Sequence, residues 1–126
     1  NVYLIDDFTA SGTTFIRQVD GVWKGKLKKF NDLIVKARES LQEEFPVSDS
    51  YALHIHHYVS TEQARAALEE RVADAKANLE NRSFHEVTIT EGLRLPASLK
   101  MVNGTDTAML DLCERYYDDH LYQRLK

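Results

Sequence analysis

Residues 2–14 read Val-Tyr-Leu-Ile-Asp-Asp-Phe-Thr-Ala-Ser-Gly-Thr-Thr, and this stretch decides the fold that we expect for the chain. It opens with four mostly apolar residues and no polar alternation, which is typical of a short strand buried on both faces of a parallel sheet. We expect this strand to end at Ile5 or Asp6, so that Asp6 and Asp7 emerge at its carboxyl end, where open α/β sheets bind ligands. Adjacent like charges repel, so the pair favours contact with a cation or with several hydroxyl groups.

The segment after the two acids is small and rich in hydroxyl groups: Thr9, Ala10, Ser11, Gly12, Thr13 and Thr14. Glycine permits a positive φ or a close approach of the backbone, and the hydroxyl groups would lie beside the free N–H groups of a helix start. Such a loop is suited to binding phosphate. The alternative is a buried strand followed by an Asp-rich turn that caps a helix. That alternative accounts for Asp7 and Thr9 but leaves the paired acids and the hydroxyl-rich loop unexplained.

Residues 2–14 closely resemble the thirteen-residue signature with which the type I phosphoribosyltransferases bind 5-phosphoribosyl pyrophosphate (PRPP). The resemblance implies that Asp6 and Asp7 bind the ribose 2′- and 3′-hydroxyls and serve as the catalytic residues. It implies that residues 9–14 bind the 5′-phosphate. It also implies Mg2+ as the cofactor, brought by the substrate to the neighbourhood of Asp6 and Asp7, with no certain metal ligands from the protein itself.

One position departs from part of this family. Members that salvage purines often carry an acid in the loop that acts as general base, and the matching position here is Ala10. A proton acceptor must then come from elsewhere, or be unnecessary as in orotate-type members. We expect a phosphoribosyltransferase that binds PRPP or a ribose-5-phosphate nucleotide and releases pyrophosphate. The alternative is a non-catalytic module of a larger multidomain protein that senses PRPP or a nucleotide.

The length of 126 residues is that of one domain. In the family that residues 2–14 resemble, the signature lies in the later half of the domain, whereas here it opens the chain. We therefore expect residues 1–126 to be a partial domain, the C-terminal part of a phosphoribosyltransferase-like fold. Other parts of a parent chain, or a second copy in a homo-oligomer, would then complete it.

Composition excludes several classes of partner. The net charge is −4, and no run of basic residues is longer than Lys28-Lys29, which argues against a nucleic-acid groove. No run of apolar residues is long enough to predict a membrane span, so no membrane partner is expected. The single Cys113 cannot form an internal disulfide and fits a reducing, cytoplasmic location.

Strands and helices alternate along the rest of the chain, which predicts a three-layer α/β fold with a mostly parallel sheet flanked by helices, in a Rossmann-like topology. The predicted elements after the first strand are a short helix from residue 15 to 19, a long amphipathic helix over 22–44, a strand over 51–59, a helix from the capping box at 60–63 to residue 79, a strand over 84–90 and a last helix beginning near residue 105.

Two groups of polar residues have no settled role. His54 and His56 point to one face of their predicted strand and His57 to the other, so at most two of them can share an ion, and zinc is not expected. His57 lies near the carboxyl end of the strand, where it could approach the ligand crevice. Glu91 and Arg94 follow the last strand and either contact a substrate or form an ordinary surface pair, the reading that we favour.

Overall fold

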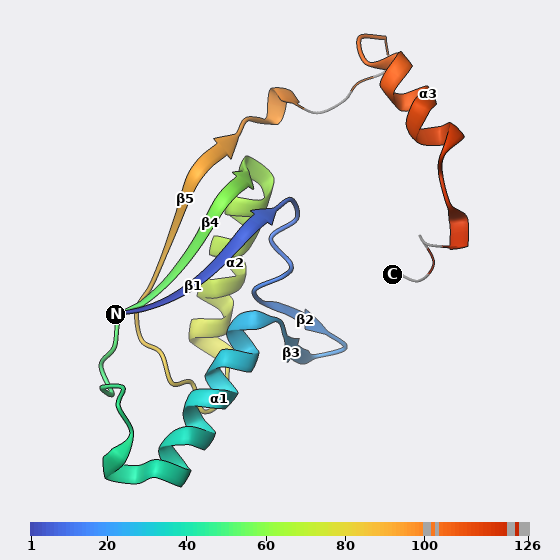
Figure 1. Ribbon diagram of the computed structural model, residues 1–126. Coiled ribbons are helices and arrows are strands. Elements are labelled where there is room, and N and C mark those ends of the chain that lie inside the picture. The colour runs from blue at the N-terminus through green and yellow to red at the C-terminus, as the bar shows by residue number, and fades with distance from the viewer. Residues whose placement is uncertain (100–101, 103, 121–122, 124–126) are drawn as a thin grey trace.

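A computed structural model describes residues 1–99, 102, 104–120 and 123 of the chain, and it has an α/β fold. Its main sheet contains β1 (Val2–Thr9), β4 (Leu53–Thr61) and β5 (Val87–Leu95). The strands lie in the order β1-β4-β5 and both pairs are parallel, as the alternation of strands and helices predicts (Figure 1). β4 is therefore the central strand, and the carboxyl ends of all three strands lie at the same edge.

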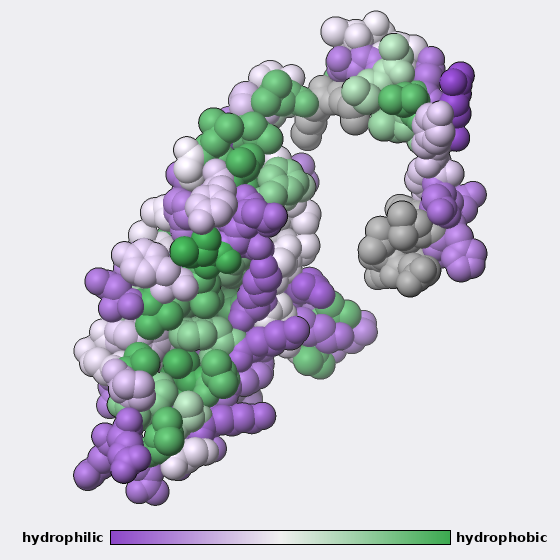
Figure 2. Space-filling model, viewed as in Figure 1, coloured by the Kyte–Doolittle hydropathy of each residue, from purple (hydrophilic) through white to green (hydrophobic). Residues whose placement is uncertain are grey.

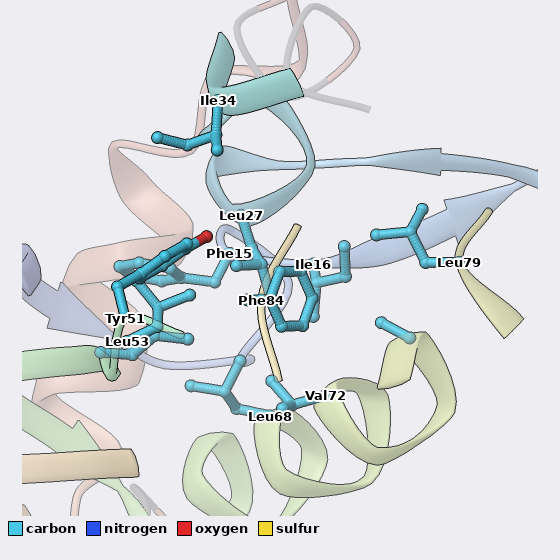
Figure 3. Packing of buried hydrophobic residues seen from close by; sticks show 12 residues of the cluster. Phe15, Ile16, Leu27, Ile34, Tyr51, Leu53, Leu68, Val72, Leu79 and Phe84 are labelled. Atoms are coloured by element: carbon cyan, nitrogen blue, oxygen red, sulfur yellow. The ribbon is translucent and has the colours of Figure 1, made fainter. Parts of the chain in front are cut away.

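Two helices cover one face of this sheet: α1 (Lys26–Leu41) and α2 (Glu62–Asn78) (Figure 1). The buried side chains between helices and sheet form a single cluster (Figure 3): Phe15, Ile16, Leu27, Ile34, Tyr51, Leu53, Ile55, Leu68, Val72, Ala75, Leu79 and Phe84. Because both helices belong to this one core, the described residues form two layers. The expected third layer is not found among them.

No described helix or strand covers the opposite face of the sheet. Along β4, Leu53, Ile55 and His57 are buried, while His54 and His56 between them are only half-buried. This alternation follows from the two-residue period of a strand, which sends successive side chains to opposite faces. Three large residues of β1 and β4 are more than half exposed: Tyr3, Ile5 and Tyr58. Figure 2 shows hydrophobic side chains gathered over the sheet on the side turned to the viewer.

The predicted helix from residue 15 to 19 is wrong, because this segment forms a β-hairpin. Its strands are β2 (Arg17–Val19) and β3 (Val22–Lys24), which pair antiparallel. The two residues between them, Asp20 and Gly21, both have positive φ, at 52° and 74°. This is the backbone that an Asp-Gly dipeptide adopts readily in a two-residue hairpin loop, where the twist of the turn matches that of the strands. The hairpin replaces both the short helix and the first turn of the predicted long helix.

The other boundaries shift by a few residues. α1 is followed by a 3-10 turn, η1 (Gln42–Glu44), and α2 is capped by Thr61, whose Oγ1 accepts a hydrogen bond from the Ala64 amide at 3.0 Å. Thr61 thus takes the capping role that the sequence pattern assigned to Ser60. β5 runs five residues further than the predicted strand and includes Glu91 and Arg94.

The last part of the described chain lies away from the sheet (Figure 1). A 3-10 turn, η2 (Ala97–Leu99), follows β5, and α3 (Thr107–Arg115) comes after it with Asp106 at its N-cap. No residue of α3 is buried, and Cys113 is exposed on it. Among the described residues, no helix has both the length and the apolar character that a membrane span needs.

Candidate functional site

Asp6 lies on β1 with its side chain turned to the face that the helices cover. Its side chain is 15% exposed, and its Oδ2 lies 2.7 Å from Nζ of Lys26, the first residue of α1. Burial alone would raise the pKa of Asp6, but the hydrogen bond and charge of Lys26 outweigh burial and lower it. Asp6 is therefore an ionised carboxylate at neutral pH, already matched by a cation.

Asp7 points to the other face. It is exposed, and its Oδ1 accepts a hydrogen bond from the Phe8 amide at 2.9 Å. The two acids diverge because β1 does not end at Ile5 or Asp6, as expected, but continues to Thr9. Within a strand, neighbouring side chains must lie on opposite faces. The structure thus brings Asp6, and not Asp7, to the covered face beside α1.

The loop after β1 is partly held by its own hydroxyl groups. Thr9 is buried, and its Oγ1 accepts a hydrogen bond from the Gly12 amide at 3.2 Å. The hydroxyl oxygens of Ser11 and Thr13 lie 2.8 Å apart and are hydrogen-bonded to each other. Thr9 and the Gly12 amide are therefore engaged inside the protein, while Ser11 and Thr14 are exposed and Thr13 is half-buried.

Gly12 meets the backbone of α2. Its φ is +66°, and a Cβ at this position would come within 2.5 Å of the Ala64 carbonyl oxygen. Any larger residue must therefore displace the loop from the first turn of α2. The close approach that the sequence suggested at Gly12 is made to the protein itself.

Three side chains from outside the loop bind its carbonyl groups. Thr61 Oγ1 donates to the carbonyl of Ala10 at 2.9 Å. Arg71 Nη1 donates to the carbonyl of Ser11 at 3.1 Å, and Arg17 Nη1 to that of Thr13 at 3.0 Å. These bonds come from the hairpin, from the last residue of β4 and from α2, so the loop is fixed between these elements.

A row of three ionisable residues crosses the covered face of the sheet. Asp6, His57 and Glu91 are register partners on β1, β4 and β5. His57 is 1% exposed, its Nε2 has no hydrogen-bond partner, and its ring lies edge-on to Phe15 at 4.9 Å between centroids. Burial lowers the pKa of His57, against the opposing effect of Asp6. His57 is thus a neutral core residue in this structure and not part of an exposed crevice.

Glu91 on β5 is the third residue of this row and forms two ion pairs. Its carboxylate binds Arg65 of α2, with 2.5 Å between Oε2 and Nη1, and it also binds Arg94. Burial raises the pKa of Glu91, but the hydrogen bonds from Arg94 and Arg65 lower it by more. The predicted pairing of Glu91 with Arg94 is confirmed, but it is not an ordinary surface pair, because the Glu91 side chain is only 9% exposed. Arg65 is the partner that sequence reasoning missed.

The other two histidines of β4 lie on the open face. The rings of Tyr3 and His54 stack with centroids 4.5 Å apart, and His56 Nδ1 lies 2.8 Å from Thr90 Oγ1. In the described ranges, no three residues of the His, Cys, Asp and Glu types are placed to hold a metal ion. A single carboxylate such as Asp6 still suits Mg2+ of the kind that takes its other ligands from phosphates and water.

One cavity lies at this edge of the molecule, and a larger one lies away from it. One, of about 170 Å³, lies at the carboxyl end of the sheet and is lined by Ala10, by residues 61–63 at the start of α2 and by Leu95, Pro96, Ala97 and Leu99. A larger cavity, about 620 Å³, lies elsewhere, between the hairpin, α1 and the end of α2. The first is the one that adjoins the loop of the predicted site.

Sequence reasoning missed Lys26. The available signal was Gly25, the glycine directly before it in the sequence. Gly25 has a φ of +117° and is the N-cap of α1, so Lys26 is the first residue of the helix.

Comparisons of the chain with protein-family models, with curated proteins and with solved structures find no match.

Proposed function

We propose that this chain is a phosphoribosyltransferase-like domain that binds PRPP, or a nucleotide carrying ribose 5-phosphate, together with Mg2+. The observation that carries the proposal is the position of Asp6. It is an ionised carboxylate three residues before the carboxyl end of the parallel strand β1, and the loop that follows contains the exposed residues Ser11 and Thr14. Ligands of open α/β sheets bind at this edge.

Each part of the site has a role in the proposal. Asp6 accepts hydrogen bonds from the ribose hydroxyls, and the hydroxyl groups of Ser11, Thr13 and Thr14 donate to the 5′-phosphate. Thr9 and Gly12 do not contact the ligand directly; the hydrogen bond from the Gly12 amide to Thr9 Oγ1 holds the loop in shape. Asp7 has the smaller share, since its side chain lies on the opposite face. We also propose that the sheet has the topology of the phosphoribosyltransferases.

The chemistry proposed is substitution at the anomeric carbon of the ribose. The bond from that carbon to the pyrophosphate oxygen breaks as the bond to the acceptor forms, and positive charge develops on the ring. Mg2+ would supply charge compensation for the departing pyrophosphate. The residues of this chain contribute by holding the ribose and the phosphate in a fixed orientation. Ala10 offers no carboxylate, so the loop takes no proton from the acceptor.

A second candidate is a module that binds the same ligand without catalysis. The Asp6–Lys26 pair and the absence of an acid at Ala10 favour it, because both leave the site suited to binding rather than proton transfer. The two candidates differ in a simple measurement. Release of pyrophosphate from bound PRPP in the presence of acceptor bases supports the transferase, and binding without release supports the sensor.

Calorimetric titration of the chain with PRPP in the presence of Mg2+ tests the shared part of both candidates. We expect saturable binding that is weakened at least tenfold by Asp6→Asn, since a hydrogen bond to a charged group contributes about 1.5–3 kcal/mol. Asp32→Asn is the matched control, because Asp32 is also paired with a lysine of α1, at 2.6 Å, but lies away from the loop. No binding by the parent chain, or equal binding by Asp6→Asn, would contradict the proposal.

A further inference from the structure

The geometry points to Lys26 as a residue that exchanges one anion for another. We infer that Lys26 neutralises Asp6 in the free protein and moves to the phosphate group of the sugar phosphate when the ribose hydroxyls bind Asp6. This inference rests on the proposed function, because it needs a phosphorylated ligand at the same site. Lys26 is then a phosphate-binding residue, and its ion pair with Asp6 neutralises that carboxylate while no ligand is bound.

The backbone of Lys26 is tied to the end of the loop. Its amide donates to the carbonyl of Thr14 at 3.1 Å, and the next amide, of Leu27, donates to the carbonyl of Phe15 at 2.8 Å. A Cβ on Gly25 would overlap the Phe15 carbonyl, so only glycine allows α1 to begin so close to the loop. The chain leaves the loop at Phe15, forms the hairpin, and comes back beside the end of the loop at Gly25 and Lys26.

The side chain of Lys26 reaches Asp6 from this start. Its Nζ lies 2.7 Å from Asp6 Oδ2 and 5.6 Å from the centroid of the Phe15 ring, and the side chain remains 48% exposed. A lysine side chain carries its charge on a flexible four-carbon stem. Because the stem begins beside Thr14, a change of rotamer moves the ammonium group between Asp6 and the loop.

Charge balance favours Lys26 over the other cations near the loop. Arg17 and Arg71 already donate to loop carbonyls, and moving either one would unfasten the loop. Asp6 is 15% exposed and needs a partner, since a buried ion without one is costly. The ribose hydroxyls and substrate-borne Mg2+ supply that partner in the complex. Lys26 is then free to offset the negative charge that the phosphate brings.

Inorganic phosphate separates this exchange from a purely structural role. Asp6→Asn frees Lys26, so the affinity for phosphate should rise, and the double variant D6N/K26Q should lose that gain. Asp7→Asn removes the same charge one residue away without freeing Lys26, so it controls for the change in net charge. We expect the gain in Asp6→Asn to exceed that in Asp7→Asn by at least threefold, measured by calorimetry or by phosphorus NMR titration.

Ribose 5-phosphate completes the test. We expect K26Q to bind it at least tenfold more weakly than the parent chain, K26R to stay within about threefold, and K28Q to be unchanged. Lys28 is a fair control because it lies on the same helix and is paired with Asp32 at 2.6 Å. Equal affinity in K26Q, or equal gains in Asp6→Asn and Asp7→Asn, would overturn the inference and leave the proposed function standing. A parent chain that binds no ribose 5-phosphate would overturn both.

Discussion

The covered face and the open face of the main sheet are built from the same three strands, yet they differ in what their polar residues do. On the covered face, Asp6 and Glu91 are ionised and each has at least one cationic partner. On the open face, Tyr3 stacks on His54, and Asp7 accepts a hydrogen bond from the neighbouring Phe8 amide. Polar groups that are shielded from water need partners, whereas those in water do not. The covered face therefore carries the organised charges, and the proposed site belongs to it.

The pair Asp6 and Asp7 shows the same contrast at single-residue scale. The two residues have the same side chain and adjoin in the sequence, but β1 sends them to opposite faces. Lys26 holds the pKa of Asp6 below its ordinary value, although burial acts against it. Position in the fold, and not residue type, thus decides which of the two acids is paired with a cation in this structure.

The largest expected difference in stability between the two faces comes from replacing two isoleucines on adjacent strands. Ile55 is 0% exposed on the covered face, and Ile5 is 55% exposed on the open face. We expect Ile55→Ala to lower the free energy of unfolding by about 2–5 kcal/mol, because it leaves a cavity in the core. Ile5→Ala should cost about 0.5 kcal/mol. Urea denaturation of both variants measures the difference, and similar losses would mean that the open face is covered in solution.

The next test concerns the loop on the covered side. Gly12→Ala should destabilise the fold by about 2–4 kcal/mol, because a Cβ would both strain a positive φ and press on the Ala64 carbonyl. Gly21→Ala is the matched control, since its φ is +74° and nothing lies within 4 Å of a Cβ there. It should cost only about 1–2 kcal/mol. Thermal melts that show equal losses would indicate that the loop does not pack on α2.

The smallest effect separates the two acids. We expect Asp6→Asn to lower the free energy of unfolding by about 1 kcal/mol at pH 7, since Lys26 is half-exposed. Asp7→Asn should change little, because an amide oxygen still accepts the bond from Phe8. The pKa of Asp6 is lowered in the folded chain, so its contribution is complete above its ordinary value of 3.8 and is lost as the pH falls below it.

Denaturation of both variants at pH 7 and near pH 3 measures this contrast. The difference between parent and Asp6→Asn should shrink at the lower pH, while Asp7→Asn should follow the parent at both. A constant difference for Asp6→Asn would show that the Lys26 pair does not form in solution.

The sequence by itself was enough to predict the parallel α/β class and the positions of β1, β4 and α2. Uninterrupted apolar runs and a clear capping pattern carry this information locally. It failed at residues 15–24, where an Asp-Gly turn and β-branched residues produce a hairpin instead of a helix. The short apolar run there fits either element, and only contacts with the rest of the fold decide between them.

For the candidate site, the sequence determined which residues are chemically suited, namely two acids followed by a hydroxyl-rich loop. The tertiary structure alone decided that Asp6 faces α1 and Asp7 faces away, since the length of β1 sets which side chains share a face. It alone placed Lys26 on Asp6 and Arg65 on Glu91. Ion pairs between residues far apart in the chain depend on how helices return to the sheet, and no local pattern encodes that geometry.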